Sequence, residues 1–288
     1  MQSYKNGKWA RQILSMRQKD GLWGNFHTLS RPLPGKNYTT EQAIRRLYYL
    51  GYTADDEVIQ IVLKRMEQCI KGELAIDHYS EKKHDWPLFE KLMLSAWLRI
   101  FDPQNEAALD VAYQWAQVVE KAFAGGSYNR DNDIAAFTEW RGRKPKSEFE
   151  TGFGMFYHAA LLSGVLSPKT EDFLLDYYLS KPDGMFYIYD KPLNKPPIVF
   201  ASRSASRYLA AIEVLSRYGR AKDKLAFVID WLTANQDENG QWNFGEKAKD
   251  GIYFPLSDRW DKTARLADST YRVSKVFSAL SLSQPEDA

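Results

Sequence analysis

The chain has 288 residues, a length that fits one large domain or two of ordinary size. Hydrophobic residues make up 44% of it and charged residues 26%, which provides enough apolar side chain for a sizeable core and excludes intrinsic disorder. The formal net charge of +2 gives no general attraction to nucleic acid or to an anionic membrane, and a single cysteine, Cys69, excludes an internal disulfide and a cysteine-built zinc site.

The first fifteen residues contain basic side chains but no apolar core of signal-peptide length. No stretch of about 18 apolar residues, the length that a membrane-spanning helix needs, occurs in the sequence. We therefore expect a cytoplasmic protein without an integral membrane segment.

A short motif recurs along the chain, consisting of a glycine, one further residue, and then a large apolar or aromatic residue. The successive glycines are 51, 54, 58 and 56 residues apart, and they are Gly21, Gly72, Gly126, Gly184 and Gly240. Periods of this size are typical of arrays of supersecondary units. The regular interval favours one domain over residues 1–288, built from about five repeated units.

Each unit is predicted to contain two helices of different character. Helices with a one-sided apolar face, typical of the outside of a bundle, are expected at 8–18, 59–70, 109–123, 168–180 and 222–236. They alternate with segments that are apolar almost all round, at 41–50, 87–101, 150–164, 203–218 and 267–280. A helix that is apolar on every side is buried on every side, so this second set forms the inner helices.

The first predicted helix has no partner before it, and the last has none after it. The simplest completion pairs residues 8–18 with residues 267–280, which closes the array into a ring. The sequence therefore predicts an all-α protein, a closed α/α toroid of about five helical hairpins with a parallel inner ring and an antiparallel outer ring. An open solenoid of helical hairpins is the alternative, although its period is usually nearer to about 34 to 47 residues.

Two of the motif segments, residues 18–24 and 235–245, resemble the Gln-Trp repeats of squalene-hopene cyclases and the related repeats of protein prenyltransferase beta subunits. Both families are helical toroids, so the resemblance implies that fold and an isoprenoid- or terpenoid-like ligand in a central cavity. The cyclase acid motif Asp-x-Asp-Asp is absent, because residues 131–134 match two of its three acidic positions. Cys69 lies on the apolar face of an outer helix, away from a zinc site of the prenyltransferase kind. We predict no metal and no other cofactor.

The predicted connections alternate in length. Those from an inner to an outer helix are short, whereas the others span roughly 19–40, 71–86, 124–149, 181–202 and 237–266. In a toroid the long ones share the face at which the inner helices begin. Long loops often carry function, and helix N-termini favour anionic groups. We therefore expect one dominant pocket at this face for a small-molecule substrate or ligand, with an anionic one favoured.

Candidate catalytic residues lie on two inner helices. Glu150, Gly154 and His158 are four residues apart along the helix predicted at 150–164, so they share a face with a gap at the glycine. A carboxylate and an imidazole beside a pocket can act as acid and base, and Asp268 completes the predicted catalytic set. The alternative for His158 is a structural histidine in the core.

Further residues are predicted to bind the ligand: Asp85, Trp86, Trp140, Arg203, Arg207, Trp260 and Tyr271. Trp86, Trp140 and Trp260 fit no repeat, and solvent-facing tryptophan beside a pocket suits ligand stacking. Trp23 and Trp242 belong to the repeat and are expected to pack between neighbouring hairpins.

For the charged members of this set a structural role is the alternative. Arg203 and Arg207 are four residues apart on an inner helix, and they either bind an anion or pair with nearby carboxylates. Asp85 precedes Trp86 and Pro87 at the start of the second inner helix, where N-capping competes with ligand binding.

Three kinds of function stay open, and the sequence leaves undecided whether the protein is an enzyme. The first is an enzyme or binding protein for an isoprenoid-like ligand in a central cavity. The second is a carbohydrate-active lyase or hydrolase that acts on an acidic sugar, and the third is a non-catalytic scaffold. A cavity lined by aromatic and aliphatic groups favours the first, and charged groups interleaved with aromatic ones favour the second.

Overall fold

The computed structural model describes residues 4–29, 35, 37–76, 85–147 and 150–281. In this part of the chain the regular structure is helical, and apart from two isolated β-bridges it contains no strand, so the prediction of an all-α protein is confirmed. In chain order the helices are α1 (Lys8–Ser15), α2 (Thr40–Tyr49), α3 (Glu57–Ile70), α4 (Trp86–Phe101), α5 (Glu106–Ala122), α6 (Arg130–Arg141), α7 (Phe156–Leu162), α8 (Pro168–Ser180), α9 (Arg203–Leu215), α10 (Ala221–Lys224), α11 (Ala226–Ala234), the short 3-10 helix η2 (Glu246–Ala248) and α12 (Lys262–Ser281).

The predicted inner helices correspond to α2, α4, α7, α9 and α12, and the outer helices correspond to α1, α3, α5, α8 and the pair α10 and α11. The last inner helix begins at Lys262, earlier than the predicted residue 267. Two further expectations are wrong. The third inner helix starts at Phe156 instead of residue 150, and the connection 124–149 contains a further helix, α6. In α6 the side chain of Asn129 caps the N-terminus, and Gly142 ends the helix in the left-handed conformation.

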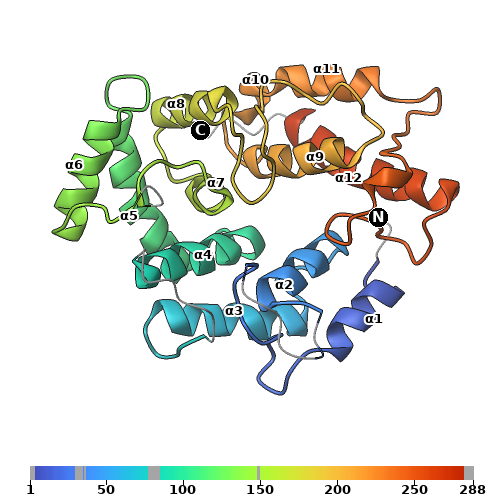
Figure 1. Cartoon of the computed structure of the whole chain (residues 1–288), viewed down its shortest axis with the longest axis horizontal. Coiled ribbons are helices and arrows are strands. Elements are labelled where there is room, and N and C mark those ends of the chain that lie inside the picture. Colours follow the sequence, from blue (N-terminus) through green and yellow to red (C-terminus); the bar gives the residue numbers. More distant parts are fainter. Residues whose placement is uncertain (1–3, 30–34, 36, 77–84, 148–149, 282–288) are drawn as a thin grey trace.

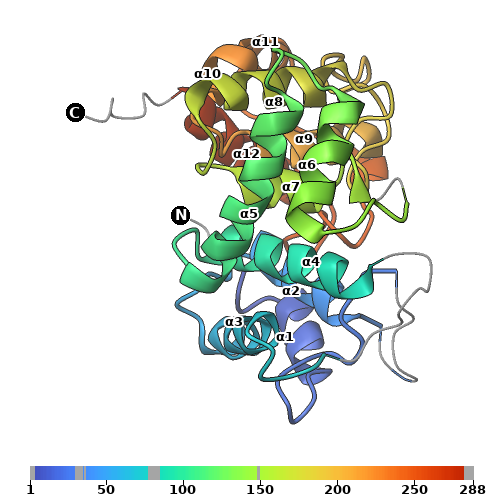
Figure 2. The ribbon, with the colours of Figure 1, turned by 90° about the vertical axis from the view of Figure 1, so that its left-hand side faces the viewer.

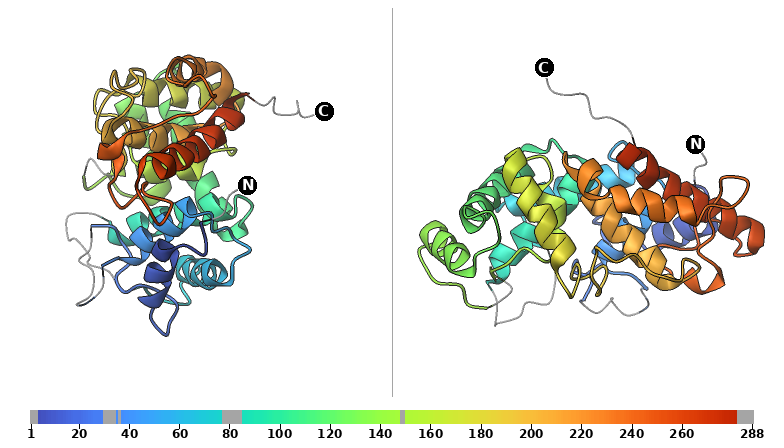
Figure 3. Two further views of the ribbon diagram at one scale, coloured as in Figure 1. Left: turned by 90° about the vertical axis from the view of Figure 1, so that its right-hand side faces the viewer. Right: turned by 90° about the horizontal axis from the view of Figure 1, so that it is seen from above.

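Figure 1 shows the helices following one another around the molecule in chain order, with α2, α4, α7 and α9 nearer its middle than α3, α5, α8 and α11. The side view agrees, because α8, α10 and α11 lie at one end, α1 and α3 lie at the other, and α4, α7 and α9 lie between them (Figure 2). The last helix, α12, packs against α9 and α11 (Figure 3).

The N-terminal part of the chain contacts its C-terminal part. The indole N–H of Trp9 donates to the carbonyl of Ser257 at 2.9 Å, and the rings of Tyr4 and Tyr271 meet edge to face at 5.3 Å. We expected helix 8–18 to pack directly against 267–280. The hydrogen bonds of α1 instead reach Ser257 and Asp258 in the connection that precedes α12, and α12 itself is contacted by Tyr4, which lies before α1.

The two repeat tryptophans, Trp23 and Trp242, each connect the turn in which they lie to the preceding outer helix and to the following inner helix, as predicted. Trp23 donates its indole N–H to the carbonyl of Ile13, ten residues earlier, and its backbone N–H to the hydroxyl of Thr40 at the start of the next inner helix. Trp242 makes the same two bonds, to a carbonyl ten residues earlier and to a threonine hydroxyl of α12. Both indoles are buried, so each joins an outer helix, a turn and an inner helix into one unit.

The glycines of the motif adopt the conformation that the sequence predicts. Gly21, Gly184 and Gly240 have φ angles of +89°, +65° and +75°. Glycine takes such angles without steric cost. The surroundings differ, because a Cβ atom on Gly184 would collide with backbone carbonyl oxygens, whereas one on Gly240 would lie 3.3 Å from the flexible end of Gln236.

We therefore expect graded effects of alanine in these turns. Gly240→Ala should lower the free energy of unfolding by about 1 kcal/mol, the cost of a side chain at positive φ, and Gly184→Ala should cost more because backbone must also move. Gly125→Ala is the control, since its φ is not positive and nothing lies within 4 Å of an added Cβ. Urea denaturation measures the differences, and equal effects at all three positions would contradict the explanation.

Candidate functional site

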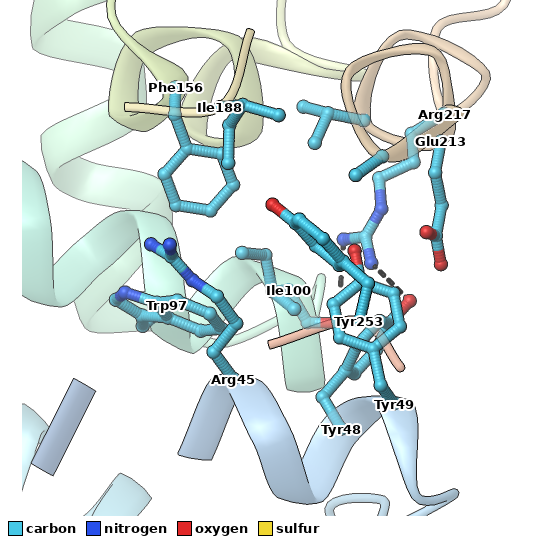
Figure 4. Close-up of a pocket in the computed structure, with 12 residues that line it drawn as sticks. Arg45, Tyr48, Tyr49, Trp97, Ile100, Phe156, Ile188, Glu213, Arg217 and Tyr253 are labelled. Carbon is cyan, nitrogen blue, oxygen red and sulfur yellow. Dashed lines mark hydrogen bonds between the residues drawn. The ribbon is translucent and has the colours of Figure 1, made fainter. Parts of the chain in front are cut away.

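A pocket lies where α2, α4, α7 and α9 converge, and we call it the central pocket (Figure 4). It is lined by Arg45, Tyr48, Tyr49, Trp97, Ile100, Phe156, Ile188, Ala210, Glu213, Val214, Arg217 and Tyr253. Its cavity volume of about 30 Å³ is room for one or two water molecules. The pocket therefore admits an end group of a ligand, and a larger body requires side chains to move apart.

The central pocket lies toward the C-terminal ends of three inner helices, α2, α4 and α9. Tyr49 is the last residue of α2, Ile100 lies in the last turn of α4, and Arg217 follows α9. The lining also includes Phe156, the first residue of α7, and Ile188 and Tyr253 from two long connections. From the sequence we expected the pocket at the N-terminal ends of the inner helices alone. Helix C-termini favour cations, and Arg217 donates to the carbonyl of Ile100 there at 3.4 Å.

Arg45 forms what we call the floor of the central pocket, and it belongs to a buried ion pair whose other member, Glu41, does not itself line the pocket. Arg45 and Glu41 are four residues apart on α2, and Nη2 of Arg45 lies 3.1 Å from Oε1 of Glu41. The same carboxylate accepts the indole N–H of Trp97 at 2.9 Å, the hydroxyl of Tyr157 at 2.8 Å and the backbone N–H of Thr28 at 2.6 Å. Donors from α4, α7 and the connection before α2 thus meet at one buried side chain of α2.

These contacts keep both members of the pair charged. Burial by itself would raise the pKa of Glu41, but Arg45 and the surrounding donors hold this pKa below its ordinary value. Burial by itself would lower the pKa of Arg45, yet the attraction of Glu41 leaves it raised. The guanidinium lies 5.4 Å from the ring centre of Trp97 and 5.3 Å from that of Phe156, and its buried Nε has no hydrogen-bond partner in the described part of the chain.

Two further arginines face the other aromatic walls. Arg217 donates to the hydroxyl of Tyr48 at 3.0 Å, as Figure 4 shows. Arg272, on α12, lies 5.0 Å from the ring centres of both Tyr49 and Tyr253. The rings of the pocket are therefore already paired with permanent cations.

The groups at and behind this lining carry an excess of positive charge. The lining contains two guanidinium groups, those of Arg45 and Arg217, and one carboxylate, that of Glu213. Behind it, Arg272 and Glu41 add one charge of each sign, so the net charge of the set is +1. The nearest approach of Arg272 to Glu213 is 3.9 Å, which is a loose pair. An anionic group would improve the charge balance at the floor.

The described residues that line the central pocket include none of the predicted site residues. Among the latter, His158 lies in the core, fully buried between the rings of Trp115 and Phe153 at 4.7 Å and 5.7 Å. Burial lowers its pKa to about 3, so it is neutral at physiological pH. The core position agrees with the alternative of a structural histidine, but neither ring nitrogen has a hydrogen-bond partner within the described residues, and the acid–base role stays a prediction.

Glu150 precedes α7, so the predicted shared helical face with Gly154 and His158 is wrong. Its carboxylate pairs with Arg143 at 2.7 Å and accepts the backbone N–H of Asp85 at 3.0 Å. Burial would raise the pKa of Glu150, but these contacts lower it overall. Asp85 accepts the backbone N–H of Leu88, so it is an N-cap, and it also pairs with Arg143. Glu150 and Asp85 are therefore joined by one arginine.

The C-terminal members of the predicted site organise the connection before α12. Asp268 is buried and accepts the backbone N–H groups of Leu256 and Ser257 at 2.7 Å and 2.9 Å. Arg203 donates to a carbonyl in the segment 246–250, and Arg207 lies 3.9 Å from a carboxylate of the same segment. Trp260 donates its indole N–H to a carbonyl there at 3.0 Å. These residues lie around one connection and have structural partners.

The remaining predicted ligand-binding residues lie in separate places. Trp86 is the first residue of α4, Trp140 is on α6 and contacts the ring of Trp115, and Tyr271 contacts Tyr4 near the N-terminus. Their role in stacking against a ligand stays a prediction.

Sequence reasoning missed the residues of the central pocket, although α2 carried a signal. Glu41 and Arg45 stand in a segment otherwise interpreted as buried on all sides, and charged groups in such a helix need partners. The i, i+4 spacing of opposite charges also indicated the pair. Trp97 and Tyr157 had no such signal, because an aromatic residue in a buried helix is ordinarily core.

Comparison with known proteins found no match. No family model matches the chain, and neither a curated protein nor a solved structure is significantly similar to it. The resemblance in the motif segments therefore stays a prediction. Within the described residues, every helix is too short or too polar to cross a membrane.

The buried pair yields a prediction about stability. Glu41→Gln leaves Arg45 charged and without a counter-ion in the core, so the free energy of unfolding should fall by about 3 to 5 kcal/mol. The matched control is Glu67→Gln on α3, which breaks an i, i+4 pair with Lys71 at the surface and should cost less than about 1 kcal/mol. Urea denaturation compares them, and similar losses would argue against a structural role of the buried pair.

The environment of His158 predicts a dependence of stability on pH. Its pKa is about 3 in the folded state against 6.5 for an unperturbed histidine, so below about pH 6.5 the unfolded chain binds a proton that the folded chain does not. Stability from this group is complete above that pH and falls on acidification, by about 2 kcal/mol between pH 7 and pH 5. His158→Phe should remove this part of the pH dependence. Denaturation curves at both pH values test it, and an unchanged slope in the variant would contradict the assignment.

Proposed function

We propose that the helices form a closed α/α toroid and that the protein binds a small molecule in the central pocket, namely an isoprenoid-like ligand that carries an acidic group. The order of the helices around the molecule and the contacts between its two ends support the toroid. The observation that carries the binding function is the combination of an apolar lining with an incompletely satisfied arginine at its floor.

The lining supports an apolar ligand body. Half of the lining residues have apolar side chains, either aliphatic or aromatic: Trp97, Ile100, Phe156, Ile188, Ala210 and Val214. Small-molecule sites are typically lined in this way, with a few polar groups that fix orientation. The half-buried rim, which includes Tyr48, Tyr49 and Ile100, offers a surface for the part of the ligand that the cavity cannot hold.

The floor supports an acidic end group. Arg45 has an unused Nε–H, and a buried donor without a partner is rare in folded proteins. A carboxylate or phosphate oxygen can accept this bond, and it offsets the net charge of +1 around the pocket. Binding is favoured over cyclisation through a carbocation, because the aromatic rings already face guanidinium groups and a further cation would be repelled.

An acidic sugar is the second candidate, and one observation favours it. Arg45, Glu213 and Arg217 line the pocket together with three tyrosines, and charged and aromatic groups in one lining are suited to an acidic carbohydrate. The aliphatic residues of the lining make this candidate weaker, because a sugar needs hydrogen-bond partners on most sides.

Calorimetric titration with three probes tests the proposal: farnesoic acid, the neutral farnesol, and a uronic-acid trisaccharide. Farnesoic acid should bind at least about tenfold more tightly than farnesol, since a charge-assisted bond to Arg45 distinguishes them. Tighter binding of the trisaccharide would replace the proposal by the second candidate, and absence of binding by all three would favour a scaffold.

A variant with a larger side chain in the central pocket tests whether the ligand binds there. Val214→Phe enlarges a side chain that lines a small cavity, so it should abolish binding of farnesoic acid. The matched control is Val199→Phe, at a side chain that is 64% exposed and outside the pocket, which should bind as the parent protein does. Equal binding by both variants would locate the ligand elsewhere, and melting temperatures show that both are folded.

A further inference from the structure

A second cavity, of about 300 Å³, lies where the N-terminal end of α7 meets the C-terminal end of α8, and we call it the side pocket. Its lining consists of Thr151, Gly152, Gly154, Met155, Tyr177, Lys181, Asp183 and Phe186. The volume lies at the lower end of the range of small-molecule sites. The side pocket shares no lining residue with the central pocket among the described parts of the chain.

Backbone pairing fixes the two walls of the side pocket relative to each other. The N–H of Phe186 donates to the carbonyl of Gly154 at 2.9 Å, and the N–H of Phe156 donates to the carbonyl of Phe186 at 3.1 Å. The next residue, Tyr187, has a φ of +76°, and it is the one described non-glycine residue at positive φ. Strained backbone of this kind persists where the surroundings fix it, often beside functional sites. The side chain of Phe186 is left 48% exposed at the rim.

Two glycines make room for polar groups in this pocket. A Cβ atom on Gly154 would lie 2.6 Å from Cε of Lys181, so a side chain there would push the lysine out. Gly152 has a φ of +73°, and an added Cβ would lie 3.4 Å from the hydroxyl of Tyr177. Glycine is therefore favoured at position 154 because Lys181 occupies the space beside it, and at position 152 because the backbone has a positive φ.

Lys181 is a mostly buried cation with an exposed counter-ion. Its side chain is 20% exposed, and its Nζ lies 5.4 Å from the ring centre of Tyr177 and 2.9 Å from Oδ1 of Asp183. The side chain of Asp183 is 73% exposed. An ion pair with one partner in water is weak, so another carboxylate can replace Asp183 without leaving a buried charge unpaired.

We propose that the side pocket is a second binding site, which takes a small planar aromatic carboxylate. The carboxylate of the ligand replaces Asp183 at Nζ of Lys181, and its ring lies against Phe186 and Tyr177, where aromatic contacts favour it. The hydroxyl of Thr151 is a further donor at the wall. This inference is independent of the function proposed for the central pocket.

Titration with benzoate, monitored by ligand-observed NMR and by calorimetry, tests the proposal. Two variants are expected to change the affinity for benzoate in opposite directions. Lys181→Met should weaken binding at least about tenfold, because the cation is lost. Asp183→Asn should strengthen it about two- to fivefold, because the competing carboxylate is removed while the lysine stays. Benzamide, which has the same shape without charge, should bind at least about tenfold more weakly than benzoate.

Matched controls use charged residues on the surface of α10. Lys222→Met and Asp223→Asn remove the same groups outside the side pocket, and Asp223 is likewise the exposed partner of an ion pair. Neither should change the affinity for benzoate. Unchanged or weaker binding by Asp183→Asn would overturn the proposal even if Lys181→Met failed to fold, because Asp183 is an exposed side chain. Equal affinity for benzamide, or no saturable binding of benzoate, would also overturn it.

One variant separates this proposal from the function of the central pocket. Val214→Phe should leave binding of benzoate unchanged, because Val214 does not line the side pocket. Loss of benzoate binding in this variant would assign the probe to the central pocket and would overturn the side pocket as its site.

Discussion

The carboxylate of Glu41 is the interaction on which the middle of the molecule depends. It accepts hydrogen bonds from Arg45 on the same helix, from Trp97 on α4, from Tyr157 on α7 and from the connection before α2. A buried charge is tolerated only when its partners are complete, so a shift of any of these helices would leave it unsatisfied at a cost of several kcal/mol. Apolar packing alone accepts many alternative registers, and this carboxylate selects one of them.

The fixed pair also determines what surrounds it. The guanidinium of Arg45 has one carboxylate partner, which does not satisfy all of its N–H donors. The ring faces of Trp97 and Phe156 provide additional stabilisation of its positive charge. Arg217 and Arg272 repeat this arrangement against the tyrosines of the pocket. The middle of the protein therefore contains repeated arginine–aromatic contacts, and the buried Nε of Arg45 has no hydrogen-bond partner within the described residues.

The turns and helices could be predicted because their causes are local. Positive φ at Gly21 and Gly240, and the bonds of Trp23, depend on residues within one repeat and the start of the next helix. The site depends on contacts between distant segments, which periodicity does not report. Glu150 was assigned to a helix because it begins the segment 150–164, which is apolar almost all round farther along, but the helix starts at Phe156 and Glu150 pairs with Arg143 in the preceding connection. In a helix that is apolar all round, the sequence also does not indicate which side faces a cavity.

The two pockets differ in whether their cations can exchange partners. Glu41 is completely buried, so it cannot leave Arg45 for water, and a ligand in the central pocket can add a charge but cannot replace one. Asp183 is exposed, so its departure from Lys181 costs little and water solvates it at once. Exchange of one carboxylate for another is therefore cheap in the side pocket, whereas the central pocket must widen before a ligand body can enter it. For this reason we expect weak and fast binding at the side pocket, and slower, more selective binding at the central one.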